Sequence, residues 1–112
     1  MRILVVRPGA IGDSLLTFPI LHALHTPGSS LTFVSNSAVI PLALSWQLAD
    51  EVHDYQALQW SELFSTTGVR SPALRALLAS TDLAICWLRD PDGIVERNLR
   101  APPLPGCIAI GL

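Results

Sequence analysis

The sequence predicts an α/β protein built on a Rossmann-like, doubly wound parallel sheet. Five apolar segments of strand length alternate with segments of helical periodicity over 112 residues, and the connections between them are short. Half of the residues are hydrophobic and only 14% are charged, whereas about 25% are charged in a typical soluble domain. We therefore expect one small domain whose strands are buried on both faces by helices.

The expected strands are runs of apolar and β-branched residues. The first, Arg2–Arg7, is entirely apolar between its two arginines, which is typical of a central parallel strand. The segment at 51–55 has mixed polarity, which indicates a strand at the edge of the sheet. The remaining strands are expected at 31–35, 82–88 and 107–112.

The expected helices follow these strands in order. In segment 14–25, Leu16, Ile20 and Leu24 recur every four residues, and Pro19 predicts either a kink or a helix that begins near Phe18. Ser71 and Pro72 predict the start of another helix, as N-cap and first helical residue. Further helices are expected at 38–48 and 94–99, with turns at 90–93 and 101–106.

Composition excludes several classes of protein. The net charge is −2, there is no lysine, and the seven arginines are scattered, so the sequence does not predict a nucleic-acid partner or a phosphate-binding loop lysine. No apolar run approaches the roughly 18 residues of a membrane span, and Arg7 and Pro8 interrupt the first apolar run too early for a signal peptide. A cytoplasmic protein is expected, with Cys86 and Cys107 reduced and buried in strands.

The loop at 8–13 is the leading candidate for a binding site. It follows the first strand, near the point where strand order is expected to reverse, and its glycines let a ligand approach the backbone. Its spacing does not match the dinucleotide-binding pattern, and Ser35 and Asn36 stand where an acidic ribose-binding residue would be. Asp13 is either the N-cap of the following helix or a carboxylate that accepts a proton from a nucleophile.

Other polar and aromatic residues are interpreted as structural. His22 and His25 are three residues apart, a spacing that a metal could use, but no third ligand accompanies them, so no metal site is predicted. The three tryptophans are expected to serve as packing residues or interdomain contacts: Trp46, Trp60 and Trp87.

Residues 1–24, MRILVVRPGAIGDSLLTFPILHAL, resemble the start of glycosyltransferase family 9, the ADP-heptose:lipopolysaccharide heptosyltransferases and their relatives. The matching features are the apolar first strand, a basic residue with a small-residue loop ending in Gly-Asp, and an apolar helix with Thr-x-Pro in its early turns. Residues 83–111 resemble the family's later strand, helix and strand more loosely.

The resemblance implies an incomplete N-terminal domain of a GT-B glycosyltransferase. Residues 1–112 would be the acceptor-side domain, and the C-terminal domain that binds the nucleotide-sugar would be absent. Such enzymes invert the anomeric centre without a metal or cofactor, and take a sugar from a donor such as ADP-heptose to a lipopolysaccharide-type or other lipid-linked glycan. They work in the cytoplasm, at the inner face of the inner membrane, with peripheral membrane contact.

The resemblance also assigns residues. Asp13 matches the proposed general base, which deprotonates the acceptor hydroxyl. Gly9, Gly12 and Ser14 would lie against substrate. Arg7 would face an acidic acceptor or the donor diphosphate, unless it is only a surface arginine at the end of a strand. The family often has Asp and Gly in the loop after the fourth strand, but turn chemistry explains Asp90 and Asp92 better.

Two alternatives to an acceptor-side domain remain open. The chain could be a non-catalytic Rossmann-like module that binds a nucleotide or phosphate at loop 8–13, or an inactive truncated reading frame. In every case we expect no sugar transfer from the 112 residues alone. We also expect strand 107–112 to lack a covering helix, so that its uncovered face and the cleft side meant for a second domain leave a contiguous apolar patch.

Overall fold

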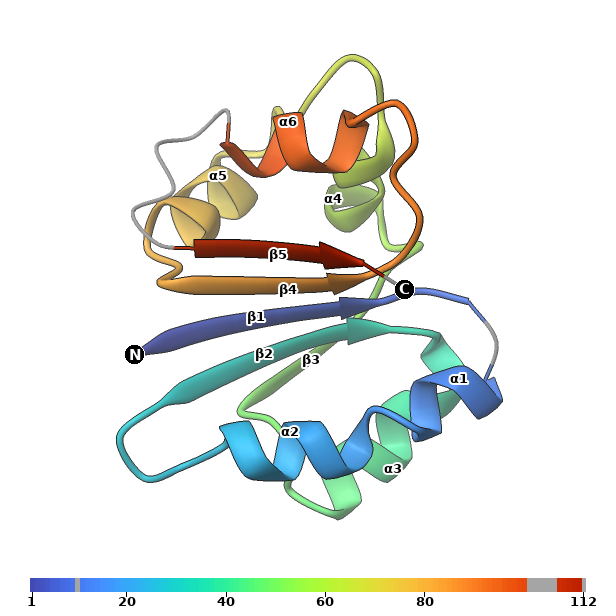
Figure 1. The fold of residues 1–112 in the computed structure, drawn as a ribbon, viewed down its shortest axis with the longest axis vertical. Coiled ribbons are helices and arrows are strands. Elements are labelled where there is room, and N and C mark those ends of the chain that lie inside the picture. The colour runs from blue at the N-terminus through green and yellow to red at the C-terminus, as the bar shows by residue number, and fades with distance from the viewer. Residues whose placement is uncertain (10, 101–106, 112) are drawn as a thin grey trace.

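The computed structural model describes residues 1–9, 11–100 and 107–111, and only the backbone of residues 11, 13, 58 and 107. It contains a five-stranded sheet with strand order β3-β2-β1-β4-β5, in which every neighbouring pair is parallel. Helices lie on both faces of this sheet (Figure 1). The predicted α/β, doubly wound, Rossmann-like architecture is therefore confirmed.

The elements alternate along the chain as expected. The strands are β1 (Arg2–Arg7), β2 (Ser30–Ser35), β3 (Glu51–Asp54), β4 (Leu83–Trp87) and β5 (Cys107–Gly111). The α-helices are α1 (Ile11–Leu15), α2 (Phe18–Leu24), α3 (Ile40–Ser45), α4 (Leu58–Ser61), α5 (Pro72–Ala79) and α6 (Ile94–Arg100). Two single turns of 3₁₀-helix, η1 (Ser37–Val39) and η2 (Glu62–Phe64), precede α3 and follow α4.

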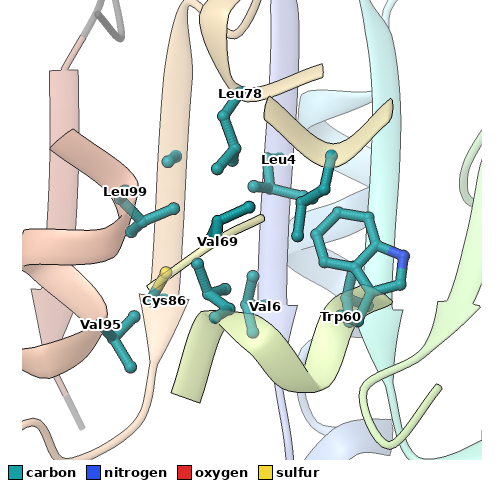
Figure 2. Close-up of a cluster of buried hydrophobic side chains, with 12 residues drawn as sticks. Leu4, Val6, Trp60, Val69, Leu78, Cys86, Val95 and Leu99 are labelled. Carbon is teal, nitrogen blue, oxygen red and sulfur yellow. The ribbon is translucent and has the colours of Figure 1, made fainter. Parts of the chain in front are cut away.

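Alternate residues of the central strand supply both cores. Ile3 and Val5 pack with the α1–α3 layer, while Leu4 and Val6 pack with the α4–α6 layer, because successive side chains of a strand point to opposite faces. On the second face, Trp60, Leu78 and Leu99 come from three helices and meet over β1 and β4 (Figure 2). Burial of both faces accounts for the uninterrupted apolar sequence of β1.

Proline divides the helix that the sequence predicts over 14–25. The structure has α1 up to Leu15 and then α2 from Phe18, with Pro19 in the first turn of α2. Proline suits that position because a helix leaves its first N–H groups without intrahelical partners. Of the two alternatives that the sequence left open, a helix that begins near Phe18 is confirmed.

Two further expectations can be compared with the structure. Strand β3 lies at the sheet edge, and the Ser71 hydroxyl accepts a hydrogen bond from the Leu74 N–H, both as predicted. The sequence analysis assigned no element to segment 56–70, which forms α4 and η2. The predicted turn at 101–106 lies outside the described residues.

Strand β5 pairs with β4, as expected, but the predicted apolar patch does not lie on its described residues. Ile108 and Ile110 pack against the α4–α6 core, and Ala109 is the exposed apolar side chain of this strand. The large exposed apolar side chains lie mainly in the α1–α3 layer instead. Within the described ranges, no helix has the length and apolar character needed to cross a membrane.

Candidate functional site

The carboxyl ends of β1, β2 and β4 meet at one edge of the sheet (Figure 1). The chain runs outward from β1 to β2 and β3, then returns to β4 on the other side of β1, so strand order reverses between β1 and β4. Open α/β sheets bind ligands at the carboxyl edge beside such a reversal. The candidate site is therefore at the end of β1, where the sequence placed it.

Arg7 spans this reversal point. Its Nη1 donates a hydrogen bond to the Trp87 carbonyl oxygen at 2.9 Å, which joins the last residue of β1 to the last residue of β4. The side chain is half-buried. Arg7 therefore holds a positive charge at the candidate site, and its contact with a substrate remains a prediction.

The loop after β1 is fixed by its own glycine and by the neighbouring strand. Gly9 has φ 106°, a left-handed conformation that residues with a Cβ rarely adopt. The Asn36 side chain donates from Nδ2 to the Gly9 carbonyl oxygen at 2.9 Å and accepts from the Ala38 N–H at 2.9 Å. Asn36 thus braces the loop and caps η1 at the same time, a role that the sequence analysis did not assign.

Ser14 also braces the loop. Both Ser14 and Ser35 are fully buried, their hydroxyl oxygens are 2.9 Å apart, and the Ser35 hydroxyl donates to the Arg7 carbonyl oxygen at 2.7 Å. The Thr17 hydroxyl donates to the Ser14 carbonyl oxygen at 2.6 Å. Ser14 was assigned to substrate, but in this structure its side chain faces inward and fixes the start of α1 against β2.

Gly12 and Asp13 lie in the first turn of α1. Gly12 is exposed, and a Cβ built on it would have nothing within 4 Å, so neither space nor φ requires a glycine there. Because α1 begins at Ile11, Asp13 lies inside the helix, and the N-cap alternative is wrong for this helix. The side chain of Asp13 lies outside the described residues, so its role as a general base stays a prediction.

A second element of this edge is the loop between β4 and α6. A cavity of about 480 Å³ lies there, between the ends of β4 and β5, and the exposed Arg89 is among the residues that line it. Asp90 accepts hydrogen bonds from the N–H groups of Val95 and Glu96, both at 3.0 Å, and so caps α6. Asp92 is exposed.

The structural role predicted for Asp90 is therefore confirmed. Its carboxylate caps the first turn of α6. Sequence reasoning assigned no role to Arg89, which it left between the strand at 82–88 and the turn at 90–93. The signal was present, since a basic residue directly after a buried parallel strand lies at the ligand-binding edge.

The remaining reactive groups do not extend the site. Cys86 is buried in β4, and burial raises the pKa of its thiol to about 12, so it is not a nucleophile at neutral pH. The backbone of Cys107 lies in β5, and its side chain lies outside the described residues. Among the side chains that the structure describes, no three His, Cys, Asp or Glu come together as a metal site.

Comparisons with known proteins add little to this geometry. Neither a family model nor a curated protein matches the chain. A solved structure described as "Structure of MT0777" aligns with 99% of this chain and 85% of its own chain, at 21% sequence identity and with a TM-score of 0.48. Fold and candidate site therefore rest on the chain's own structure.

Proposed function

We propose that residues 1–112 are the acceptor-side domain of an inverting, metal-independent glycosyltransferase of the family 9 type. This enzyme would move a heptose or a related sugar from a nucleotide diphosphate donor to a glycan or lipid-linked acceptor. The observation that carries the proposal is the position of the β1–α1 loop. It opens at the reversal point of the sheet directly into a helix whose first turn contains Asp13.

In the proposed reaction, the Asp13 carboxylate takes the proton of an acceptor hydroxyl. The hydroxyl oxygen forms a bond to the anomeric carbon of the donor sugar from the opposite face, and the bond to the nucleotide diphosphate breaks with its electron pair. Gly9 and Gly12 let the acceptor approach the loop, and Arg7 supports a phosphate or carboxylate group of the acceptor. The donor would be held by a second domain outside these residues.

The general base can be tested with the chain joined to a donor-binding domain. Asp13→Asn keeps the size of the side chain and removes its basicity, so turnover should fall about 10²–10⁴-fold while the acceptor KM changes little. Asp92→Asn is the matched control, because Asp92 is an exposed aspartate at the same edge of the sheet. An unchanged turnover of the Asp13→Asn enzyme would refute the assignment.

The 112 residues alone should bind acceptor but not transfer sugar. We expect backbone NMR shifts of Gly9 and Gly12 when a lipopolysaccharide-core oligosaccharide is added, and no product from ADP-heptose. The main alternative is a non-catalytic module that binds a nucleotide or phosphate at loop 8–13, and the cavity beside Arg89 at the same edge of the sheet supports it. Shifts around that cavity with ADP, and none with the oligosaccharide, would support this alternative and contradict an acceptor-side domain.

A further inference from the structure

The α1–α3 layer carries almost no charge. From Ser14 to Ala49 the sequence contains no Asp, Glu, Lys or Arg, a run of 36 residues in a chain with sixteen charged residues. The run includes α2, η1, α3 and the whole of β2. The outer surface of this layer therefore depends on apolar groups and on small polar groups for its contact with water.

Most of the large exposed apolar side chains of the described residues lie in this uncharged run. Leu16 is 76% exposed and Trp46 is 61% exposed, and the others in the run are Leu15, Ile20, Leu42 and Leu44. A large side chain has on the order of 200 Å² of surface, so these six leave on the order of 600 Å² in contact with water. These side chains lie in two segments of the same layer, 15–20 and 42–46, and exposed apolar area of this extent often marks an interaction surface.

A groove runs between α2 and the end of α3 within this surface. It has a volume of about 600 Å³ and is lined by Leu15, Phe18, Pro19, His22, Trp46 and Leu48. The rings of Phe18 and Trp46 meet edge to face with centroids 5.6 Å apart, which holds the indole in place beside the groove. Trp46 therefore forms an exposed wall of the groove.

We propose that this uncharged face binds a second copy of the same chain. A protein partner with a charged surface would find no ion pair on this face and would lose hydration, whereas two copies of the face meet without repulsion. The apolar area also fits, because a standard interface buries about 800 Å² per partner, of which somewhat more than half is apolar. A twofold arrangement uses the same patch on both copies, so that the two grooves and their Trp46 walls face each other.

A lipid bilayer is the rival occupant. Helices that lie on membranes generally carry Lys or Arg beside their apolar face, which attracts them to anionic lipid. The run from Ser14 to Ala49 has neither residue. Charge therefore favours a second copy over a bilayer.

Sedimentation velocity over a range of protein concentrations tests the proposal. The 112-residue chain should show a monomer–dimer equilibrium, and Leu16→Glu should weaken the dimer at least about 100-fold, because it places an unpaired carboxylate in an apolar contact. Leu16 is mostly in solvent in the monomer, so this variant should still fold. Ala76→Glu is the matched control, since Ala76 is exposed on α5 in the opposite layer, and its dimer should be as stable as the parent's.

Several results would overturn the proposal. A parent chain that stays monomeric at every concentration, or that forms only polydisperse aggregates, contradicts it. So does a dimer that Leu16→Glu and Ala76→Glu weaken equally, because the contact then lies elsewhere. A monomeric parent chain that binds phosphatidylcholine vesicles, with binding lost in Leu16→Glu, would assign the face to lipid instead.

Discussion

The two helical layers bury comparable cores against the sheet but differ in the surfaces that they show to water. The outer surface of the α4–α6 layer carries charged side chains that make polar contacts within the layer. Arg97 donates a hydrogen bond to the Thr66 carbonyl oxygen, and Arg100 forms an ion pair with Glu96. In the α1–α3 layer, leucines and Trp46 occupy the equivalent outer positions. Both layers bury their inner faces against the sheet, so inner burial does not distinguish their outer surfaces. The distribution of charged residues does distinguish them.

The largest expected effect contrasts the two tryptophans. Trp60 is 1% exposed at the centre of the α4–α6 core, so Trp60→Ala should lower the free energy of unfolding by about 3–5 kcal/mol. Trp46 is 61% exposed and packs edge to face against Phe18, so Trp46→Ala should cost about 1 kcal/mol in the monomer. Urea unfolding at low protein concentration measures both, and equal losses would show that the layers do not differ as described.

A smaller effect concerns a polar side chain that is buried in the α4–α6 layer. Asn98, on α6, is 1% exposed, and its Nδ2 donates to the carbonyl oxygens of Leu63 at 2.9 Å and Ser65 at 2.8 Å. Asn98→Ala leaves these carbonyls without that donor in a buried place and should cost about 1–3 kcal/mol. Asn98→Asp should cost more, because a carboxylate would face two carbonyl oxygens. If Asn98→Ala unfolds at the same urea concentration as the parent, the amide does not hold α6 to η2.

The contacts of Asn98 also explain why the sequence did not predict α4 and η2. The strands could be predicted closely, because runs such as Arg2–Arg7 are apolar and β-branched and no helical period competes with them. The turns α4 and η2 could not, because they have only four and three residues. They are held by contacts distant in sequence, which are the burial of Trp60 and the bonds from Asn98.

The candidate site was predictable in position and less so in detail. Alternation of strands and helices places the end of β1 at the binding edge, and the structure agrees. The inward orientation of Ser14 could not be foreseen, since it depends on Ser35 in another strand. The part of the apolar patch that was expected on strand 107–112 is wrong, because Ile108 and Ile110 pack against the α4–α6 core. Leu16 and Ile20 are exposed despite their regular helical spacing.

The smallest expected effect concerns two aspartates at the opposite edge of the sheet, one in each half. Asp50 accepts the Leu31 N–H at 2.7 Å, and its own N–H donates to the Leu31 carbonyl oxygen. Asp82 makes the same pair of bonds with Arg2. Asp50 differs in a further contact, since His25 Nε2 lies 3.1 Å from its carboxylate.

Asp50 should therefore make stability depend on pH. The hydrogen bond from Leu31 holds the pKa of the Asp50 carboxyl below its ordinary value of 3.8, with a further contribution from His25 and against the opposing effect of burial. A lowered pKa in the folded state stabilises the protein above about pH 4, and this stabilisation is lost as pH falls through the lowered value.

We expect Asp50→Asn to cost about 1 kcal/mol or less at pH 7, because the carboxylate is about half exposed and an amide oxygen can still accept from Leu31. The cost should shrink towards zero as the pH is lowered below 4, where the parent carboxyl becomes protonated as well. Urea unfolding of both proteins at pH 7 and at pH 3 measures this change. A cost that is the same at both pH values would mean that the charge of Asp50 does not contribute to stability. The contacts of Asp50 with Leu31 and of Asp82 with Arg2 would then be equivalent.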